Sequence, residues 1–187
     1  MERRPVTDID AAKRIEGGDL AATESFVCEN YAPVLRFLRQ LTGHVQEAED
    51  LTQQAFIKAK HQIGSFRGDA SLRSWLFRIA FHEYTHWKRR RRPTTGLEIA
   101  PAHVEPAYDS VLEAEALLSA LGRLPASLRA AFLLHEVQEL TVKEVASVLG
   151  VPQGTVKSRL FHARRKLSWL LEGQQEVENE VRPALES

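Results

Sequence analysis

The sequence lacks several features that would place it in a common class of protein. Its only cysteine, Cys28, excludes an intrachain disulfide and a zinc site built from several cysteines. No apolar run approaches the length of about 18 residues that a membrane span needs, and we expect no secretory signal because the first residues lack an apolar stretch. None of the ten glycines falls in a GxGxxG or GxxxxGK pattern, which excludes the common phosphate-binding loops. We therefore expect a cytoplasmic protein with no membrane insertion and no nucleotide-binding loop.

The charges are arranged in blocks, although the net charge of the 187 residues is zero. Residues 20–93 and 119–171 each carry +5, whereas residues 94–118 carry −5 and residues 172–187 carry −4. Charge runs often mark only a solvated surface. Here each basic block concentrates its cations at one end of a segment with periodic apolar residues, so we interpret the two blocks as two contacts with nucleic acid.

Apolar residues recur at intervals of three and four rather than two, which predicts helices and no convincing strand. In the first half we expect three helices and one loop, and we expect Pro33 to kink or split the first of these helices. The helices should cover residues 19–43, 46–63 and 71–92, with a loop over residues 64–69 and a stop at Pro93. Residues 93–107 contain three prolines and one glycine, a composition typical of a linker.

The second half predicts two amphipathic helices, over residues 109–121 and 126–138, followed by a helix-turn-helix. Thr141 to Glu144 has the form of a capping box, and Gly150 suits the end of the short helix that follows. The last helix repeats apolar residues at intervals of four and three and carries cations on its other faces. A short helix, a tight turn and a basic second helix are typical of a helix-turn-helix. The predicted fold class is therefore all-α, with two small helical domains joined by a flexible linker.

Three segments resemble the extracytoplasmic-function group of bacterial sigma factors. LTVKEVASVLGVPQGTVKSRLFHARRKL, at residues 140–167, is similar to region 4, and EAEDLTQQAFIKAK and FRGDASLRSWLFRIA, at residues 47–60 and 66–80, are similar to region 2. The resemblance implies a sigma factor that directs core RNA polymerase to promoters, with region 2 opening the −10 element and region 4 reading the −35 element. It implies core RNA polymerase, promoter DNA and an anti-sigma factor as partners, with no cofactor, no metal and no catalytic residue. The implied domains are residues 1–93, a linker over residues 94–116, residues 117–172, and an acidic tail over residues 173–187 that we expect to be disordered.

Region 2 has the residues that single-stranded DNA requires. Seven of the fourteen aromatic residues lie between Phe56 and Trp87 and lead into the cationic run KRRRR, so that rings could stack on bases while cations meet phosphates. At two positions the chain departs from the family, with His82 where Asn is common and His86 where an acid is common, which affects the base preference. The predicted −10 contacts are Phe66, Arg67, His82, His86, Lys88, Arg89 and Arg90.

The last helix predicts the −35 contacts. With its apolar residues turned inward, the first outward-facing residues should reach base edges, and the later cations should meet phosphates. The predicted contacts are Lys157, Ser158, Phe161, His162, Arg164 and Arg165. The resemblance also implies that Asp50, Gln53 and Gln54 dock on the polymerase. We further expect Glu144 and Arg159 to form a salt bridge between the two helices of the motif.

The proposed linker is long enough to separate the two domains on DNA. Its 23 residues reach at most about 76–83 Å, while two turns of duplex span about 68–72 Å. One chain could therefore hold two elements that far apart while its domains move independently.

Two alternatives belong to other classes of protein. His82 to His86 spell HEYTH, which matches the HExxH of zinc metalloproteases, but such an enzyme also needs a third metal ligand and a substrate cleft. The cationic run that follows almost at once opposes a dication. A helix-turn-helix regulator that is not a sigma subunit is the other alternative, and the region 2 segments argue against it.

Overall fold

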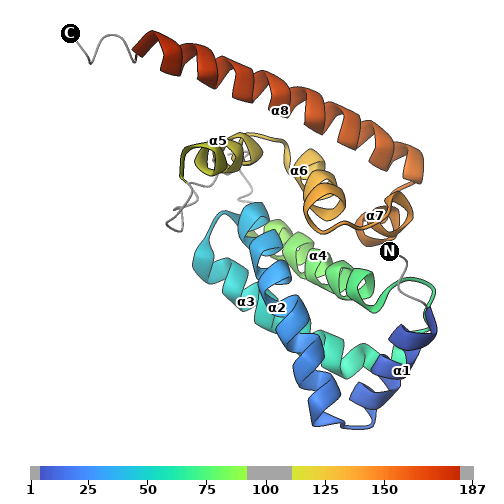
Figure 1. Ribbon diagram of the computed structural model, residues 1–187. Helices are drawn as coiled ribbons and strands as arrows, with labels where there is room; N and C mark the ends of the chain where they lie inside the picture. Colours follow the sequence, from blue (N-terminus) through green and yellow to red (C-terminus); the bar gives the residue numbers. More distant parts are fainter. Residues whose placement is uncertain (1–4, 92–110, 182–187) are drawn as a thin grey trace.

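The computed structural model describes residues 5–91 and 111–181, and within these ranges the chain is helical with short connections and no strand. The N-terminal half consists of α1 (Pro5–Glu16), α2 (Leu20–Thr42), α3 (Val45–Gln62), the short 3-10 helix η1 (Ile63–Ser65) and α4 (Leu72–Arg91). The C-terminal half consists of α5 (Val111–Gly122), α6 (Ala126–Phe132), the π-helical turn η2 (Leu133–Val137), α7 (Val142–Leu149) and α8 (Gln153–Val181). Figure 1 shows the two halves against one another, with α8 on the far side of the C-terminal half. Among the described residues, no helix combines the length and the apolar composition needed to cross a membrane.

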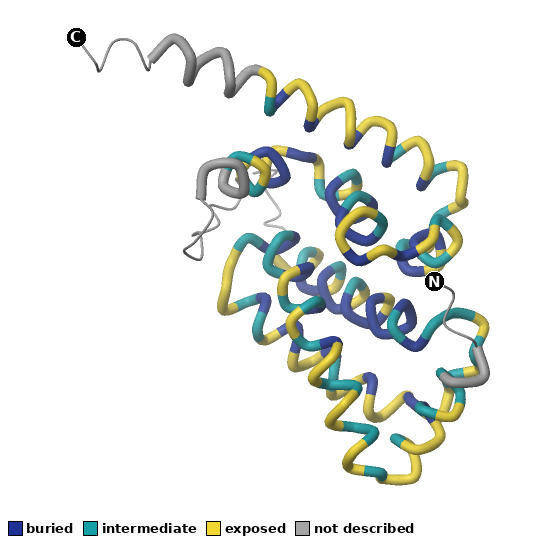
Figure 2. The backbone as a smooth tube through the Cα atoms, in the orientation of Figure 1, coloured by how far each residue is buried: buried dark blue, intermediate teal, exposed yellow. Residues whose placement is uncertain are grey.

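Helix α4 is the centre of the N-terminal half. It packs against α2 and α3, and most of its length is buried (Figure 2). The Phe77 ring of α4 meets the Phe37 ring of α2 edge to face, with 5.4 Å between the ring centroids. Because both rings are almost fully buried, this pair lies in the core that fixes α2 against α4.

The ends of α2 follow from its sequence. The Asp19 carboxylate accepts a hydrogen bond from the Ala22 amide (3.0 Å), which caps the first turn. Gly43 ends the helix with a left-handed φ of 71°, a conformation that glycine adopts without a steric penalty. Between these ends α2 continues through Pro33 as one helix, so of the two expected effects, a kink or a split, the split does not occur.

The C-terminal half is built around α8. Helices α5, α6 and α7 all pack on the apolar side of α8, where Val156, Leu160, Ala163, Leu167 and Leu170 are buried. The predicted capping box of α7 is present, and Gly150 ends α7 with a φ of 65°. The turn after Gly150 leads directly into α8, so α7 and α8 form the predicted helix-turn-helix.

The two halves contact each other through α4 and α7, and through α2 and α6. Ser71 Oγ donates a hydrogen bond to Glu144 Oε1, and Arg73 Nη2 donates to Gln138 Oε1 (2.8 Å). Arg129 Nη1 donates to the Gln40 carbonyl oxygen at the end of α2 (2.7 Å). In this structure the two halves are therefore joined by these hydrogen bonds and by the packing of α4 on α7.

Two differences from the predicted elements concern the ends of the domains. Helix α1 was not predicted. The acidic tail was expected to be disordered from residue 173, but α8 is helical as far as Val181. Residues 94–110 of the predicted linker lie outside the described residues, and residues 111–116 belong to α5, within the helix predicted over residues 109–121.

Candidate nucleic-acid interface

The predicted −35 contacts share one outward face of α8. Lys157, Ser158, Phe161, His162, Arg164 and Arg165 are all exposed, whereas the apolar residues between them are buried. An α-helix advances 100° per residue, so the six positions fall within one side of the helix. The Phe161 ring is 60% exposed and lies beside the His162 ring, with 5.4 Å between their centroids. This side of α8 therefore offers a cation, a hydroxyl, an apolar ring and an imidazole over its first three turns.

Arg164 differs from the other cations of this face because it is already paired. Its Nε donates to Glu136 Oε1 of η2 (3.0 Å), and its Nη2 forms an ion pair with the same oxygen. The pair is largely solvent-exposed, so its contribution to stability is small and it can exchange for a phosphate at little cost.

The expected salt bridge between Glu144 and Arg159 is absent from the structure. The Glu144 carboxylate instead accepts hydrogen bonds from the Thr141 amide and hydroxyl (3.0 and 2.9 Å) and from the Ser71 hydroxyl of the other half. Burial raises the pKa of Glu144, but the hydrogen bonds from Ser71 and Thr141 outweigh burial and hold it below its usual value. Glu144 therefore serves the capping box and the contact between the halves.

Several of the predicted −10 contacts follow one stripe of α4. Phe66, in the loop before α4, packs edge to face on Trp75 with 5.9 Å between the centroids. His82 and His86 lie 7 and 11 residues after Trp75, close to whole numbers of helical turns, so all three positions share one side of α4. Both histidines are exposed, with 5.6 Å between their ring centroids. Phe66 is only partly exposed, so any base that it meets must approach the open face of its ring.

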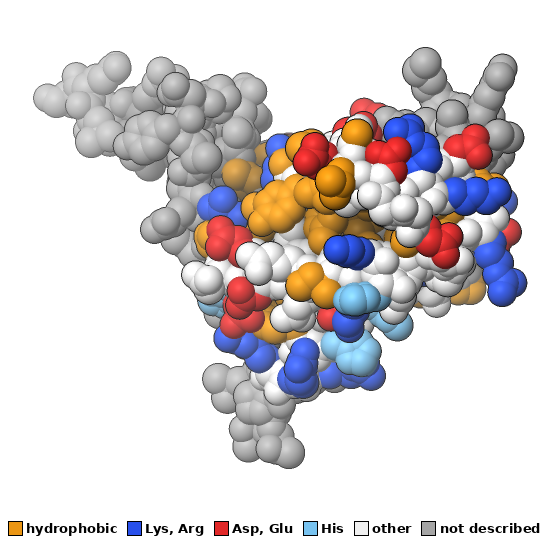
Figure 3. All heavy atoms as spheres, turned by 90° about the horizontal axis from the view of Figure 1, so that it is seen from below, with side chains coloured by type: hydrophobic (Ala, Val, Ile, Leu, Met, Phe, Trp, Pro, Cys, Tyr) orange, Lys and Arg blue, Asp and Glu red, His pale blue; other side chains and the backbone are white. Residues whose placement is uncertain are grey.

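The cationic end of α4 is divided between structural and exposed residues. Arg91 forms an ion pair with Glu47 and lies over the Trp87 ring at 5.2 Å, and Trp87 Nε1 donates to the same carboxylate. Arg89 and Arg90 are exposed, as is Arg67 in the loop, while Lys88 is half-buried. Figure 3 shows a view from below, in which Lys, Arg and His side chains gather along one edge. The predicted −10 set thus includes an aromatic end at the loop and a cationic end about 25 Å away along α4.

The HExxH pattern does not build a hydrolytic metal site. Glu83, which would be the general base, is buried and forms an ion pair with Lys58 Nζ (2.6 Å). His82 and His86 are exposed on a different side of the helix. Among the described residues, no group of three or more His, Cys, Asp or Glu side chains could hold a metal ion. The Glu83 carboxylate instead joins α4 to α3 through its ion pair with Lys58.

The predicted docking residues Asp50, Gln53 and Gln54 lie together on the exposed side of α3. Ile57 extends the same side by one turn and is 57% exposed. The sequence analysis missed Ile57, although it falls outside the register of the buried residues of α3. An exposed aliphatic side chain beside polar groups is a composition suited to binding another protein.

Comparison with known protein families accounts for both halves of the chain. Residues 26–94 match the family described as sigma-70 region 2, and residues 114–167 match sigma-70, region 4. The chain is 31% identical over 181 residues to RNA polymerase sigma-H factor of Pseudomonas aeruginosa, covering 88% of this chain and 94% of that protein. It is 35% identical over 159 residues to the ECF RNA polymerase sigma factor SigM of Mycobacterium tuberculosis, covering 82% of this chain and 79% of that protein. Among solved structures, it is similar to the sigma factor RpoE of Bartonella quintana in complex with the anti-sigma factor NepR, with a TM-score of 0.70 and 27% identity, covering 80% of this chain and 96% of that one.

The low pKa of Glu144 predicts how pH affects the folded chain. A carboxyl whose pKa is lower in the folded state stabilises the fold above its unfolded value, about 4.5, and loses that contribution as pH falls through the folded pKa. Glu144→Gln should therefore be less stable than the original chain near neutral pH, and the difference should shrink as pH falls below 4.5. Urea unfolding between pH 7 and pH 3 measures this difference, with Glu24→Gln on the exposed side of α2 as the control. A difference that stays constant over this range would show that the charge of Glu144 contributes nothing.

Proposed function

The chain belongs to the sigma-70 family of RNA polymerase sigma factors, and we propose that it acts as an alternative sigma factor whose two halves divide promoter recognition between them. The observation that carries this function is the match of region 2 and region 4 in one chain, in that order and with a connecting segment between them. The domains that we propose are residues 1–93 and 117–172, joined by residues 94–116, of which the last six begin α5.

The C-terminal half reads the −35 element through α8. Its first turns present Lys157, Ser158, Phe161 and His162, which suit hydrogen bonds to base edges and apolar contact with a thymine methyl group. Arg164 and Arg165 follow, where cations of a recognition helix meet phosphates. Because the opposite side of α8 is buried against α5, α6 and α7, this helix can present only the one face.

The N-terminal half holds the opened −10 element through the loop and the stripe of α4. Phe66 supplies a ring for stacking, and Arg67 lies next to it. His82 and His86 continue toward Lys88, Arg89 and Arg90, which suit the phosphates of the strand. The work of opening is binding energy, since stacking and phosphate contacts hold the non-template strand apart while the polymerase performs the chemistry. We accordingly propose no catalytic residue in this chain.

Core RNA polymerase docks on the exposed side of α3. Asp50, Gln53 and Gln54 provide polar groups, and Ile57 adds an apolar centre to the same surface. The −10 stripe lies on α4, and the docking residues lie on the exposed side of α3. The chain can therefore bind polymerase and the opened strand at the same time, and we propose that it works in the cytoplasm, where transcription takes place.

The contact between the halves must open before one chain can occupy both promoter elements. The elements lie about 70 Å apart for a spacing of two turns of duplex, whereas here Ser71 and Arg73, at the start of α4, donate hydrogen bonds to Glu144 and Gln138 of the C-terminal half. The contacts named above are polar, so water can replace each partner when they separate. We infer that the present arrangement is the closed form of the chain, and that an anti-sigma factor is the partner able to retain it.

Transcription with purified core polymerase tests the proposed function. The chain plus core should give a promoter-specific run-off product that core alone does not give. A helix-turn-helix regulator would instead bind duplex DNA without restoring initiation to core. Failure to direct initiation with core from its own source would contradict the assignment.

The proposed base contacts and phosphate contacts along α8 give a second prediction. In the holoenzyme, Lys157→Ala should cost about 1–3 kcal/mol on the cognate −35 sequence and relax the preference at that position, because a base contact is lost. Arg165→Ala should weaken binding to all sequences alike and lower the salt slope by about one, because a phosphate contact is lost. Each variant is the control for the other. The affinity of each holoenzyme is measured on cognate and on scrambled −35 DNA over a range of salt concentrations. Equal losses on both DNAs for Lys157→Ala would reverse its assigned role.

A further inference from the structure

Helix α1 lies outside both segments that match the sigma-70 regions, and none of the predicted site residues belongs to it. It nevertheless packs against η1, α2 and α4, around the loop that carries Phe66 and Arg67. Three side chains of α1 contact this loop or its ends, and each contact has a separate physical basis.

The first contact is a hydrogen bond to the beginning of α4. Asp8 Oδ2 accepts from the Leu72 amide at 3.0 Å, and the Ser71 hydroxyl accepts from the Ser74 amide at 3.2 Å. The first amides of a helix have no partner within the helix, so these two oxygens satisfy donors that would otherwise be left without one. Asp8, which is 64 residues from Leu72 in sequence, thus fixes the point at which the loop ends.

The second contact lies inside the loop, at Gly68. Its φ of 80° is in the left-handed region, which glycine adopts without a steric penalty. A Cβ atom at this position would lie 2.7 Å from Ile9 Cδ1 and 2.8 Å from Ile9 Cγ1. Ile9 therefore packs directly on the glycine backbone, which holds the loop in this conformation from outside.

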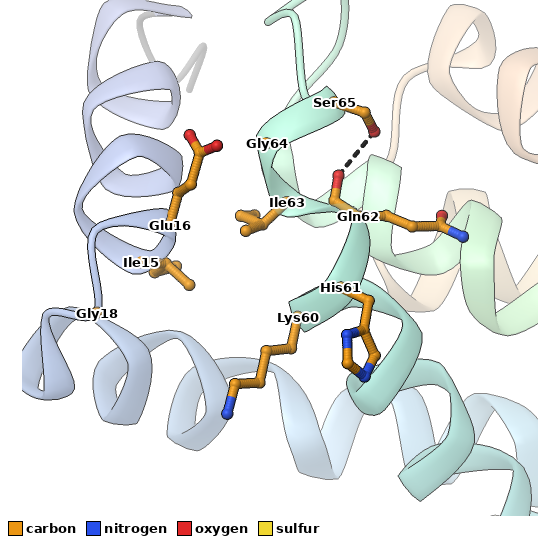
Figure 4. A pocket seen from close by; sticks show the side chains of 9 residues that line it. All are labelled: Ile15, Glu16, Gly18, Lys60, His61, Gln62, Ile63, Gly64 and Ser65. Atoms are coloured by element: carbon orange, nitrogen blue, oxygen red, sulfur yellow. Dashed lines mark hydrogen bonds between the residues drawn. The ribbon is translucent and has the colours of Figure 1, made fainter.

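The third contact is at the start of the loop. A Cβ atom on Gly64 would overlap Glu16 Oε1, so the Glu16 side chain lies over the backbone of η1. Figure 4 shows Ile15 and Glu16 of α1 on the side facing Ile63 and Gly64, beside an open cavity of about 470 Å³. Helix α1 thus touches the loop at its beginning, its middle and its end.

We propose that α1 is a positioning element for the −10 loop, with Asp8 and Ile9 as its principal positioning residues. They hold residues 64–71 in the conformation that presents Phe66 and Arg67 to the melted strand. A loop that is already ordered loses less conformational entropy when it binds DNA. By ordering the loop, α1 increases the share of binding energy available for opening the promoter. The inference rests on the proposed function, since it assigns these two residues to promoter opening.

The test compares two aspartates of the same helix in the full-length chain bound to core polymerase. Asp8→Ala removes the hydrogen bond to Leu72, whereas Asp10→Ala removes the same charge from an exposed position. Asp8→Asn keeps an acceptor oxygen and should restore the original behaviour. The fluorescence of 2-aminopurine placed in the −10 element reports promoter opening. The affinity for core polymerase and the affinity for a −35 duplex are measured in parallel.

We expect Asp8→Ala to lower the open fraction about fivefold, the scale of losing one helix cap, with the two affinities unchanged. Amide exchange over residues 64–72 should become faster in Asp8→Ala and stay the same in Asp10→Ala. Ile9→Ala, which removes the contact with Gly68 but keeps the cap, should lower opening in the same direction and serves if Asp8→Ala does not fold.

Three results would overturn the inference. The first is equal opening by Asp8→Ala and Asp10→Ala, and the second is a parallel loss of core affinity and opening, which would make α1 a general part of the fold. The third is an Asp8→Asn chain as impaired as Asp8→Ala. An unmodified chain that gives no promoter-specific transcript would refute the proposed function, and this inference with it. If the unmodified chain does give the transcript, any of the three results above refutes this inference alone.

Discussion

One buried guanidinium, that of Arg129, joins the two halves where α6 meets the end of α2. Arg129 is 7% exposed and donates to the carbonyl oxygens of Gly122 (2.6 Å), Leu124 (2.9 Å) and Gln40 (2.7 Å). Burial lowers the pKa of Arg129, with a smaller opposing effect of Tyr84, yet arginine keeps its charge in proteins. A buried charge must be hydrogen-bonded, so Arg129 draws the end of α2 and the connection between α5 and α6 around itself. Two of its three carbonyl partners belong to its own half, and these bonds need not change when the halves separate.

The start of α4 is likewise held by hydrogen bonds from both halves of the chain. Asp8 caps Leu72 from α1, within the N-terminal half, while Ser71 and Arg73 reach Glu144 and Gln138 of the C-terminal half. If the halves separate, the hydrogen bond from α1 remains, whereas the hydrogen bonds from Ser71 and Arg73 to the C-terminal half exchange for water. The loop before α4 can therefore keep its conformation while the chain extends over the promoter. The closed and open forms then differ by the movement of whole halves.

Much of the fold could be predicted because a helix leaves a local signal in the sequence, the spacing of its apolar residues and the residues that cap its ends. Periodic apolar residues predicted the helices of both halves to within a few residues, and the capping box at Thr141 and Gly150 marked α7. Helix α1 was not predicted, although its apolar residues are as periodic as those of α3, and Ala12 is its only fully buried apolar side chain among those described. The outward set on α8 was predictable because the inward register of its apolar residues left only one exposed side.

The contacts between the halves could not be predicted, because they join polar residues far apart in sequence. Ser71 and Glu144 are 73 residues apart, and Gln40 and Arg129 are 89 apart. No local pattern distinguishes such residues from an ordinary solvated surface. The predicted bridge from Glu144 to Arg159 is wrong for the same reason, since the carboxylate binds Ser71 of the other half. Ile57 did carry a signal, being apolar and out of register, that the sequence analysis did not use.

The central claim is that the chain is closed when free and opens to span a promoter, and a single distance tests it. Cys28 is the only cysteine and is exposed on α2, and Ser147→Cys adds an exposed label site on α7. Pulsed electron resonance between spin labels at these two sites measures the separation of the halves. The account predicts a single distance in the free chain, fixed by the contacts between the halves, and a distance longer by tens of ångströms in the holoenzyme on promoter DNA, as elements about two turns of duplex apart require. The same distance in both states would contradict it.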